Sequence, residues 1–149
     1  AAVFNSRGVA RLILRPWRKT PAYGFRLIGL TALLTVIFDF ALEPFAARVR
    51  HYWIWLPSHF SVSWYGAPLS NFFGWLMATL LILAFVTPAL INKQLSKPGR
   101  PDFHPLAIWL GAILLFGIGC AVHQLWPAAA ADAAIGIIAA IFAIRGARW

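Results

Sequence analysis

The chain has 149 residues, of which 61% are hydrophobic, 15% aromatic and 11% charged, with a mean hydropathy of +0.74. Soluble domains carry about 25% charged residues, whereas this chain has no charge between Arg50 and Lys93 or between Asp102 and Asp132. Uncharged stretches of that length are typical of helices buried in lipid. The composition therefore excludes a soluble domain, a disordered chain, a disulfide scaffold and a coiled coil, and it predicts an integral membrane protein.

The formal net charge of +9 is high enough to suggest nucleic-acid binding. However, membrane proteins with several spans need Lys and Arg in their cytoplasmic loops to set topology, whatever their function. We therefore predict no nucleic-acid partner. The single cysteine, Cys120, lies inside an apolar run and can form no internal disulfide.

Residues 1–20 are expected to form a basic cytoplasmic tail. Thr20 can cap the helix that follows, with Pro21 in its first turn, and Pro44 should end or kink that helix. The hydrophobic pattern predicts an all-α membrane bundle, a single domain with an aromatic-rich loop between its first two spans. The four expected spans are residues 22–43, 68–91, 105–126 and 128–144.

The basic residues predict the orientation of these spans. Only Arg48 and Arg50 would lie on the side of the first loop. Because cytoplasmic loops are enriched in Lys and Arg, the chain should sit in a bacterial or archaeal cytoplasmic membrane with both termini in the cytoplasm. The basic residues expected on the cytoplasmic side are Arg7, Arg11, Arg15, Arg18, Lys19, Lys93, Lys97, Arg100, Arg145 and Arg148.

The loop between the first two spans is unusually aromatic. An interfacial aromatic belt would account for some of these side chains. Their density predicts instead a segment that folds back into the interface and lines a cavity for a large apolar molecule. The aromatic residues are Tyr52, Trp53, Trp55, Phe60, Trp64, Tyr65, Phe72, Phe73 and Trp75.

The last span shows a pattern of small residues that we interpret as structural, and the histidines show no pattern of a metal site. Small residues recur every three or four positions and predict close helix packing. The four histidines form no pair at helical spacing, so we predict no metal site. The small residues are Ala129, Ala133, Gly136, Ala140 and Ala143.

The best candidates for chemistry are Asp39 and Glu43, which lie one turn apart on the same face of the first span. Acids inside a span are costly and usually face the bundle interior or a cavity. Two poorly solvated carboxylates this close repel each other, so one should keep a proton and could act as a general acid. In the alternative interpretation Glu43 lies at the interface and Asp39 pairs with Arg48 or Arg50. Asn71 begins the second span on the same side.

Three blocks of sequence carry a family resemblance. They are Asp39-Phe-Ala-Leu-Glu43-Pro44, Tyr52-Trp53-Ile-Trp55 and Trp64-Tyr65-Gly66-Ala-Pro68-Leu-Ser-Asn71-Phe72-Phe-Gly74-Trp75. These blocks resemble bacterial and archaeal carotenoid biosynthesis membrane proteins, a family that includes bisanhydrobacterioruberin hydratase and carotenoid 1,2-hydratase-type enzymes. The resemblance covers roughly residues 20–95 by motif and the remainder by hydropathy. Family members are longer, so the chain looks like their C-terminal portion.

The resemblance implies a lyase that adds water to the terminal double bond of an acyclic carotenoid, with no cofactor. Protonation of such an alkene gives a tertiary carbocation, which aromatic faces stabilise and water captures. Asp39 or Glu43 would be the acid, and Asn71 would orient the water. The expected substrate-binding residues are Tyr52, Trp53, Trp55, Trp64, Tyr65, Trp75 and His123.

A second interpretation is a non-catalytic subunit that binds carotenoid or fills a gap in a larger, for example photosynthetic, membrane complex. Both interpretations imply an apolar isoprenoid and membrane lipid as partners, and the second adds protein partners. Copurification of a pigmented complex in fixed stoichiometry would distinguish the second from the first. A transporter is disfavoured because no repeat with broken helices is visible.

Overall fold

The computed structural model describes residues 1–56, 62–91 and 100–149. Its helices are α1 (Ala2–Ile13), α2 (Tyr23–Pro44), α3 (Leu69–Ile91), α4 (His104–Val122) and α5 (Trp126–Ala147). Shorter elements are the turn η1 (Arg15–Trp17), the π-helical turn η2 (Phe45–Val49) and a two-stranded antiparallel ribbon of β1 (Ser63–Trp64) and β2 (Ala67–Pro68).

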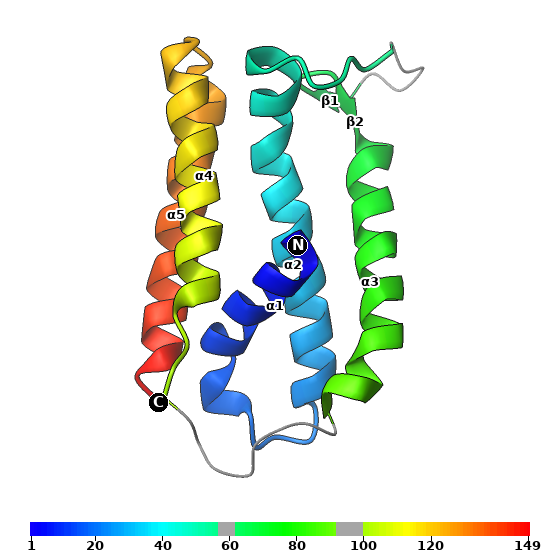
Figure 1. Cartoon of the computed structure of the whole chain (residues 1–149), viewed down its shortest axis with the longest axis vertical. Helices are drawn as coiled ribbons and strands as arrows, with labels where there is room; N and C mark the ends of the chain where they lie inside the picture. The colour runs from blue at the N-terminus through cyan, green and yellow to red at the C-terminus, as the bar shows by residue number, and fades with distance from the viewer. Residues whose placement is uncertain (57–61, 92–99) are drawn as a thin grey trace.

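Among these described residues, four helices are long and apolar enough to cross a membrane, and this confirms the predicted all-α membrane bundle. Their spans are Tyr23–Val49, Leu69–Thr87, His104–Val122 and Trp126–Ala147. Figure 1 shows α4 and α5 side by side, α2 in the middle and α3 on the far side of α2. The ribbon and residues 50–56 lie across the upper ends of α2 and α3. The chain is therefore an integral membrane protein.

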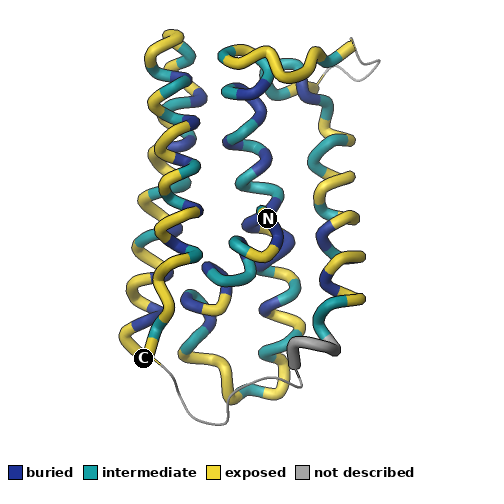
Figure 2. The backbone as a smooth tube through the Cα atoms, viewed as in Figure 1, coloured by how far each residue is buried: buried dark blue, intermediate teal, exposed yellow. Residues whose placement is uncertain are grey.

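Burial identifies α2 as the central helix. Within the hydrophobic span 39% of its residues are buried, against 11% for the span in α3. Figure 2 shows exposed positions along the outward sides of the bundle, as expected for a surface that faces lipid. Between α2 and α4 the core is aromatic, since the Phe38 ring packs at 5.8 Å from Trp109 and edge-on at 5.6 Å from Phe116.

The expectation of a basic tail is wrong for most of residues 1–20, because they form α1, which packs against α2, α4 and α5. Val9 and Ala10 are fully buried, and the Trp109 indole N–H donates to the Ser6 hydroxyl at 3.3 Å. The buried residues Val3, Ser6, Val9 and Ala10 recur at helical spacing, which makes one face of α1 suited to the bundle core.

Pro44 changes the hydrogen-bonding pattern of the helix, but the chain continues as a helical turn. The α-helix passes into the wider turn η2, where the Arg50 N–H donates to the Phe45 carbonyl five residues earlier. Proline has no N–H, so the Phe40 carbonyl has no donor at the usual position. The Trp64 indole N–H takes that place at 3.0 Å. Pro44 thus creates the acceptor that binds the ribbon to α2.

The small-residue stripe predicted for the last span is partly misplaced. Ala143 is fully buried, but Ala133 is exposed. The buried face of α5 instead includes the acid Asp132, which packs beside Gly117 of α4, where an added Cβ would lie 3.2 Å from the Asp132 Cβ. The pattern failed because it counted only small residues and so passed over Asp132.

Candidate functional site

Asp39 and Glu43 lie on the buried face of α2 and are 3% and 1% exposed. Asn71, in the first turn of α3, connects them. Its Nδ2 group donates to Asp39 Oδ2 at 2.7 Å and to Glu43 Oε1 at 3.0 Å. Both amide hydrogens are therefore used, and the Asn71 carbonyl oxygen remains as an acceptor. The structure brings all three predicted catalytic residues together.

Two tryptophans complete the surroundings of Glu43. The indole N–H groups of Trp53 and Trp55 both donate to Glu43 Oε2, at 3.2 and 2.9 Å. Residues two apart in an extended chain point to the same side, so the Trp-Ile-Trp block can direct both indoles at one oxygen. With Asn71, three N–H donors converge on Glu43, whereas Asp39 receives one among the described residues.

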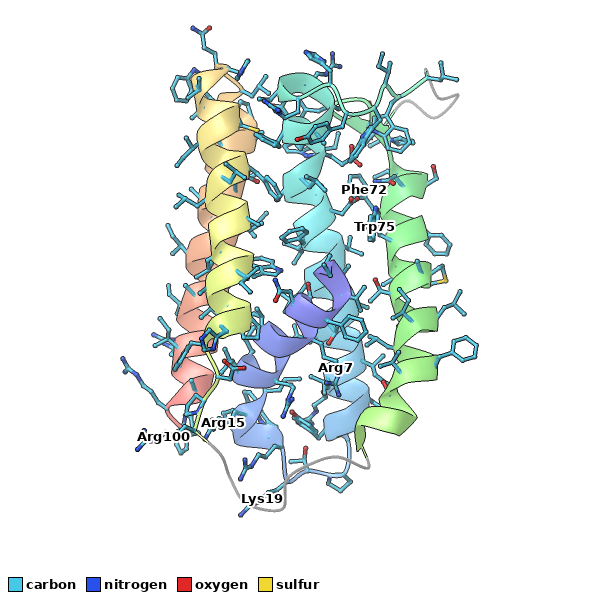
Figure 3. The ribbon with its side chains drawn as sticks, in the orientation of Figure 1. Arg7, Arg15, Lys19, Phe72, Trp75 and Arg100 are labelled. Carbon is cyan, nitrogen blue, oxygen red and sulfur yellow. The ribbon has the colours of Figure 1, made fainter. Side chains whose placement is uncertain are left out.

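These groups line a pocket of about 240 Å³. Its polar end is the carboxylate pair and Asn71, and its walls are largely indole rings, with Trp75 on α3 facing α2 (Figure 3). A pocket for a whole drug-sized ligand occupies about 300–1,000 Å³, so this one fits one end of a longer molecule. The lining residues are Asp39, Glu43, Trp53, Ile54, Trp55, Asn71 and Trp75.

Trp64 and Tyr65 are not among the residues that line the pocket. The Trp64 ring stacks on Phe40 at 4.3 Å, and the Tyr65 ring meets it edge-on at 4.8 Å. The Tyr65 carbonyl accepts a hydrogen bond from Arg48 Nε at 3.2 Å. The turn between the strands needs Gly66, whose φ is +102°. These contacts hold the ribbon that leads into α3.

Tyr52 and His123, also expected to bind substrate, are not among the residues that line the pocket, although the Tyr52 ring lies 6.3 Å from that of Trp53. Tyr52 is 61% exposed, and the Arg50 guanidinium lies 5.8 Å from its ring centre. His123 follows the last residue of α4 and is exposed. Phe60, another aromatic of the loop, lies outside the described residues.

The loop arginines do not pair with Asp39, because Arg48 binds the Tyr65 carbonyl and Arg50 packs over Tyr52. Within residues 1–56, 62–91 and 100–149, no three His, Cys, Asp or Glu side chains come together as a metal site requires. Sequence reasoning missed Ile54 in the pocket wall and the Phe40 carbonyl that binds Trp64. The signal for the second was present, since Pro44 leaves the carbonyl four residues earlier without a helical donor.

A family model described as "Carotenoid biosynthesis protein" matches residues 1–139, which include the pocket, the ribbon and all of α1 to α4. Comparisons with curated proteins and with solved structures gave no match. The family match covers most of the chain, including three of the four candidate membrane spans in full and every residue that lines the pocket. The chain therefore belongs to the carotenoid biosynthesis protein family.

Proposed function

We propose that this protein adds water across the terminal double bond of an acyclic carotenoid. The observation that carries the proposal is the pair of buried carboxyl groups, joined by one amide, at the end of a tryptophan-lined pocket. Alkene hydration needs an acid, a positioned water and an environment that tolerates a carbocation. The pocket has groups suited to each of these roles.

We assign the acid role to Asp39. Hydrogen bonds from N–H groups favour the ionised form of a carboxyl group, and three such donors converge on Glu43. With Glu43 ionised, a second charge on the neighbouring Asp39 would be repelled in this buried site. Asp39 is then the member of the pair that holds a proton and faces the substrate.

In the first step, the π electrons of the terminal double bond form a C–H bond with the Asp39 proton. The positive charge develops on the tertiary carbon and leaves Asp39 ionised. The faces of Trp53, Trp55 and Trp75 and the charge of Glu43 stabilise this carbocation. Each indole N–H bonded to Glu43 also fixes its ring, so little reorganisation is needed as the charge forms.

In the second step, water forms the C–O bond and gives one proton to Asp39, which restores the starting state. The Asn71 carbonyl oxygen, which has no donor among the described residues, can accept a hydrogen bond from this water. The reaction consumes one water per double bond and needs no oxidant or reductant, so the chemistry requires no redox cofactor.

The test is pigment analysis in a bacterial host that makes an acyclic carotenoid and expresses the gene for this chain. We expect carotenoids that have gained one water at one or both ends. Asp39→Asn should reduce their formation by about 100-fold or more, the effect expected for loss of a general acid. Asp132→Asn is the matched control because it changes another buried acid, which lies outside the pocket on α5, and it should retain activity.

Two outcomes would contradict the proposal. Unchanged pigments, with the protein present in the membrane, would exclude hydration and leave a carotenoid-binding accessory subunit as the better function. That subunit should copurify with pigment and a partner protein in fixed stoichiometry. Alternatively, full activity of Asp39→Asn with none in Glu43→Gln would reverse the two carboxyl roles.

A further inference from the structure

A polar stripe continues from the carboxylate pair along the interface of α2 and α3. On α2, the residues at four-residue spacing are Leu27, Thr31, Thr35, Asp39 and Glu43, and all five are buried. On α3, the residues at the same spacing are Asn71, Trp75, Thr79, Leu83 and Thr87. We call these two rows together the α2–α3 seam. Residues four apart are neighbours on a helix surface, so each row forms a continuous ridge that winds slowly around its helix.

Contacts at both ends show that the two rows face each other. At one end, Asn71 binds Asp39 and Glu43. At the other end, a small cavity of about 20 Å³ is lined by Thr31 of α2 and by Leu83 and Thr87 of α3, together with Arg7 of α1. Thr79 is fully buried between these ends. The register therefore places Thr79 opposite the turn of α2 that contains Thr31 and Thr35.

The threonines of the seam have unused hydrogen-bonding capacity. Thr31 and Thr35 donate to the carbonyls four residues earlier, at 2.6 and 2.9 Å, which leaves their oxygen lone pairs free to accept. The hydroxyl oxygens of Thr79 and Thr87 are buried and have no hydrogen-bond partner among the residues that the structure describes. Because buried polar groups in proteins are nearly always hydrogen-bonded, these hydroxyls indicate a small polar ligand.

The dimensions of the seam fit water. A cavity needs about 10–15 Å³ of this kind of space to hold one water molecule, and the cavity beside Arg7 provides about 20 Å³. Thr31 and Thr35, four residues apart on α2, are separated by a rise of about 6 Å, and a water with two hydrogen bonds of about 2.8 Å spans nearly that distance. One water between neighbouring hydroxyls would therefore connect them.

We propose that the α2–α3 seam binds a line of water molecules that joins Asp39 to the Arg7 cavity. This line opens the carboxylate pair to the membrane face opposite the aromatic loop, and Figure 3 shows Arg7 in the half of the bundle away from Trp75. Water and protons can then reach Asp39 while a long apolar molecule fills the tryptophan pocket. The effect of this water on turnover rests on the proposed hydration activity, whereas the presence of the bound water does not depend on that activity.

Radiolytic hydroxyl labelling of the protein in lipid nanodiscs tests the water line, because radicals formed from a bound water mark the side chain beside it. Leu83 is 1% exposed and lies between Thr79 and Thr87. Ile113 is 2% exposed and lies in the apolar core, so it is the matched internal control. We expect Leu83 to be labelled several-fold more than Ile113. In a Thr79→Val, Thr87→Val double variant, Leu83 labelling should fall to the level of Ile113.

Three controls make the labelling decisive. Ser6→Ala removes a buried hydroxyl outside the seam and should leave Leu83 labelling unchanged. Thr79→Ser keeps the hydroxyl and should retain the label. Ile113 should stay as weakly labelled in the double variant as in the unmodified protein, which shows that the bundle core is still packed.

Equal labelling of Leu83 and Ile113 in the unmodified protein would overturn the water line, whatever the activity. Labelling that survives the double variant would overturn the role of the two hydroxyls. The same double variant should hydrate carotenoid several-fold more slowly. An unchanged rate together with lost labelling would show that the water line does not supply water or protons to Asp39. If the protein hydrates nothing, the labelling still decides whether the seam holds water.

Discussion

At the scale of single residues, Glu43 is the centre of the site because its donors come from two separate parts of the chain. Trp53 and Trp55 belong to the loop after η2, and Asn71 belongs to α3. Each donor therefore ties a different segment to α2. The hydration rate should therefore be sensitive to the loss of a single N–H group bonded to Glu43, even when the aromatic ring that carried it remains.

Trp55→Phe tests that sensitivity. It removes the N–H bonded to Glu43 Oε2 at 2.9 Å and keeps an aromatic ring in the wall. A hydrogen bond to a charged group contributes about 1.5–3 kcal/mol. At the lower end of that range, expected for a partly exposed donor, the hydration rate should fall about tenfold. Pigment analysis measures the rate, and Trp126→Phe is the control because Trp126 is exposed at the start of α5. An unchanged rate in Trp55→Phe would remove this N–H from the mechanism.

Much of the site could be predicted at this scale, and the failures have a common cause. The spacing of Asp39 and Glu43 placed both acids on one face, and the structure places Asn71 beside them. Composition alone could not separate the indoles that line the pocket from Trp64, which binds a backbone carbonyl. His123 was placed on the correct end of a span, but periodicity does not fix the direction in which a helix end points.

At the scale of elements, the passage from α2 to η2 determines where the aromatic loop attaches. A helical proline was expected to end or kink the helix, and its local effect could be predicted from its missing N–H. The partner of the freed carbonyl, Trp64, lies 24 residues further on. No local pattern gives that pairing, since it depends on how the loop and the ribbon pack.

Pro44→Ala would supply the missing N–H to the Phe40 carbonyl and compete with Trp64 for it. We expect a straighter α2, a looser aromatic loop and a clear loss of hydration, while the thermal midpoint in detergent stays the same or rises. Pro127→Ala is the matched control because that proline lies in the first turn of α5 and frees no interior carbonyl. Full activity and unchanged tryptophan fluorescence in Pro44→Ala would contradict this account of the attachment.

The packing of α1 against α5 gives a prediction about stability. A Cβ at Gly146 would clash with the backbone carbonyl oxygens of Leu12 and Ile13, whereas a Cβ at Gly111 meets nothing within 4 Å. Gly146→Ala should therefore destabilise the protein by about 1–3 kcal/mol, the usual cost of overpacking. Gly111→Ala should be neutral or slightly stabilising. Thermal unfolding in detergent measures both, and equal midpoints would show that α1 is not held against α5.

At the scale of the whole molecule, hydropathy predicted the four spans because lipid burial requires long apolar helices. The distribution of charged residues predicted the N-terminal segment less well. Arg7 and Arg11 made residues 1–20 look like a tail, although the opposite face of α1 is apolar and buried. Side chains such as Arg15, Lys19 and Arg100 do lie at the same end as the C-terminus (Figure 3), whereas Lys93 and Lys97 fall outside the described residues.

We predict that this basic end faces the cytoplasm, because cytoplasmic loops are enriched in Lys and Arg. In a Cys120→Ala background, single cysteines at two exposed positions report the orientation. Gln124→Cys lies in the short turn between α4 and α5, and Arg148→Cys lies near the C-terminus. A membrane-impermeant maleimide should label Gln124→Cys in right-side-out vesicles and Arg148→Cys only after lysis. The reverse pattern would invert the topology.

The weak burial of α3 has a consequence for how the membrane acts on the chemistry. Asn71, which joins the two carboxyl groups, belongs to the span that is least enclosed by protein, whereas both acids belong to the span that is most enclosed. Bilayer thickness and lateral pressure therefore act on the donor of this amide bridge more directly than on its acceptors. The spacing of the polar groups in the site therefore depends on how the surrounding bilayer holds α3 against α2.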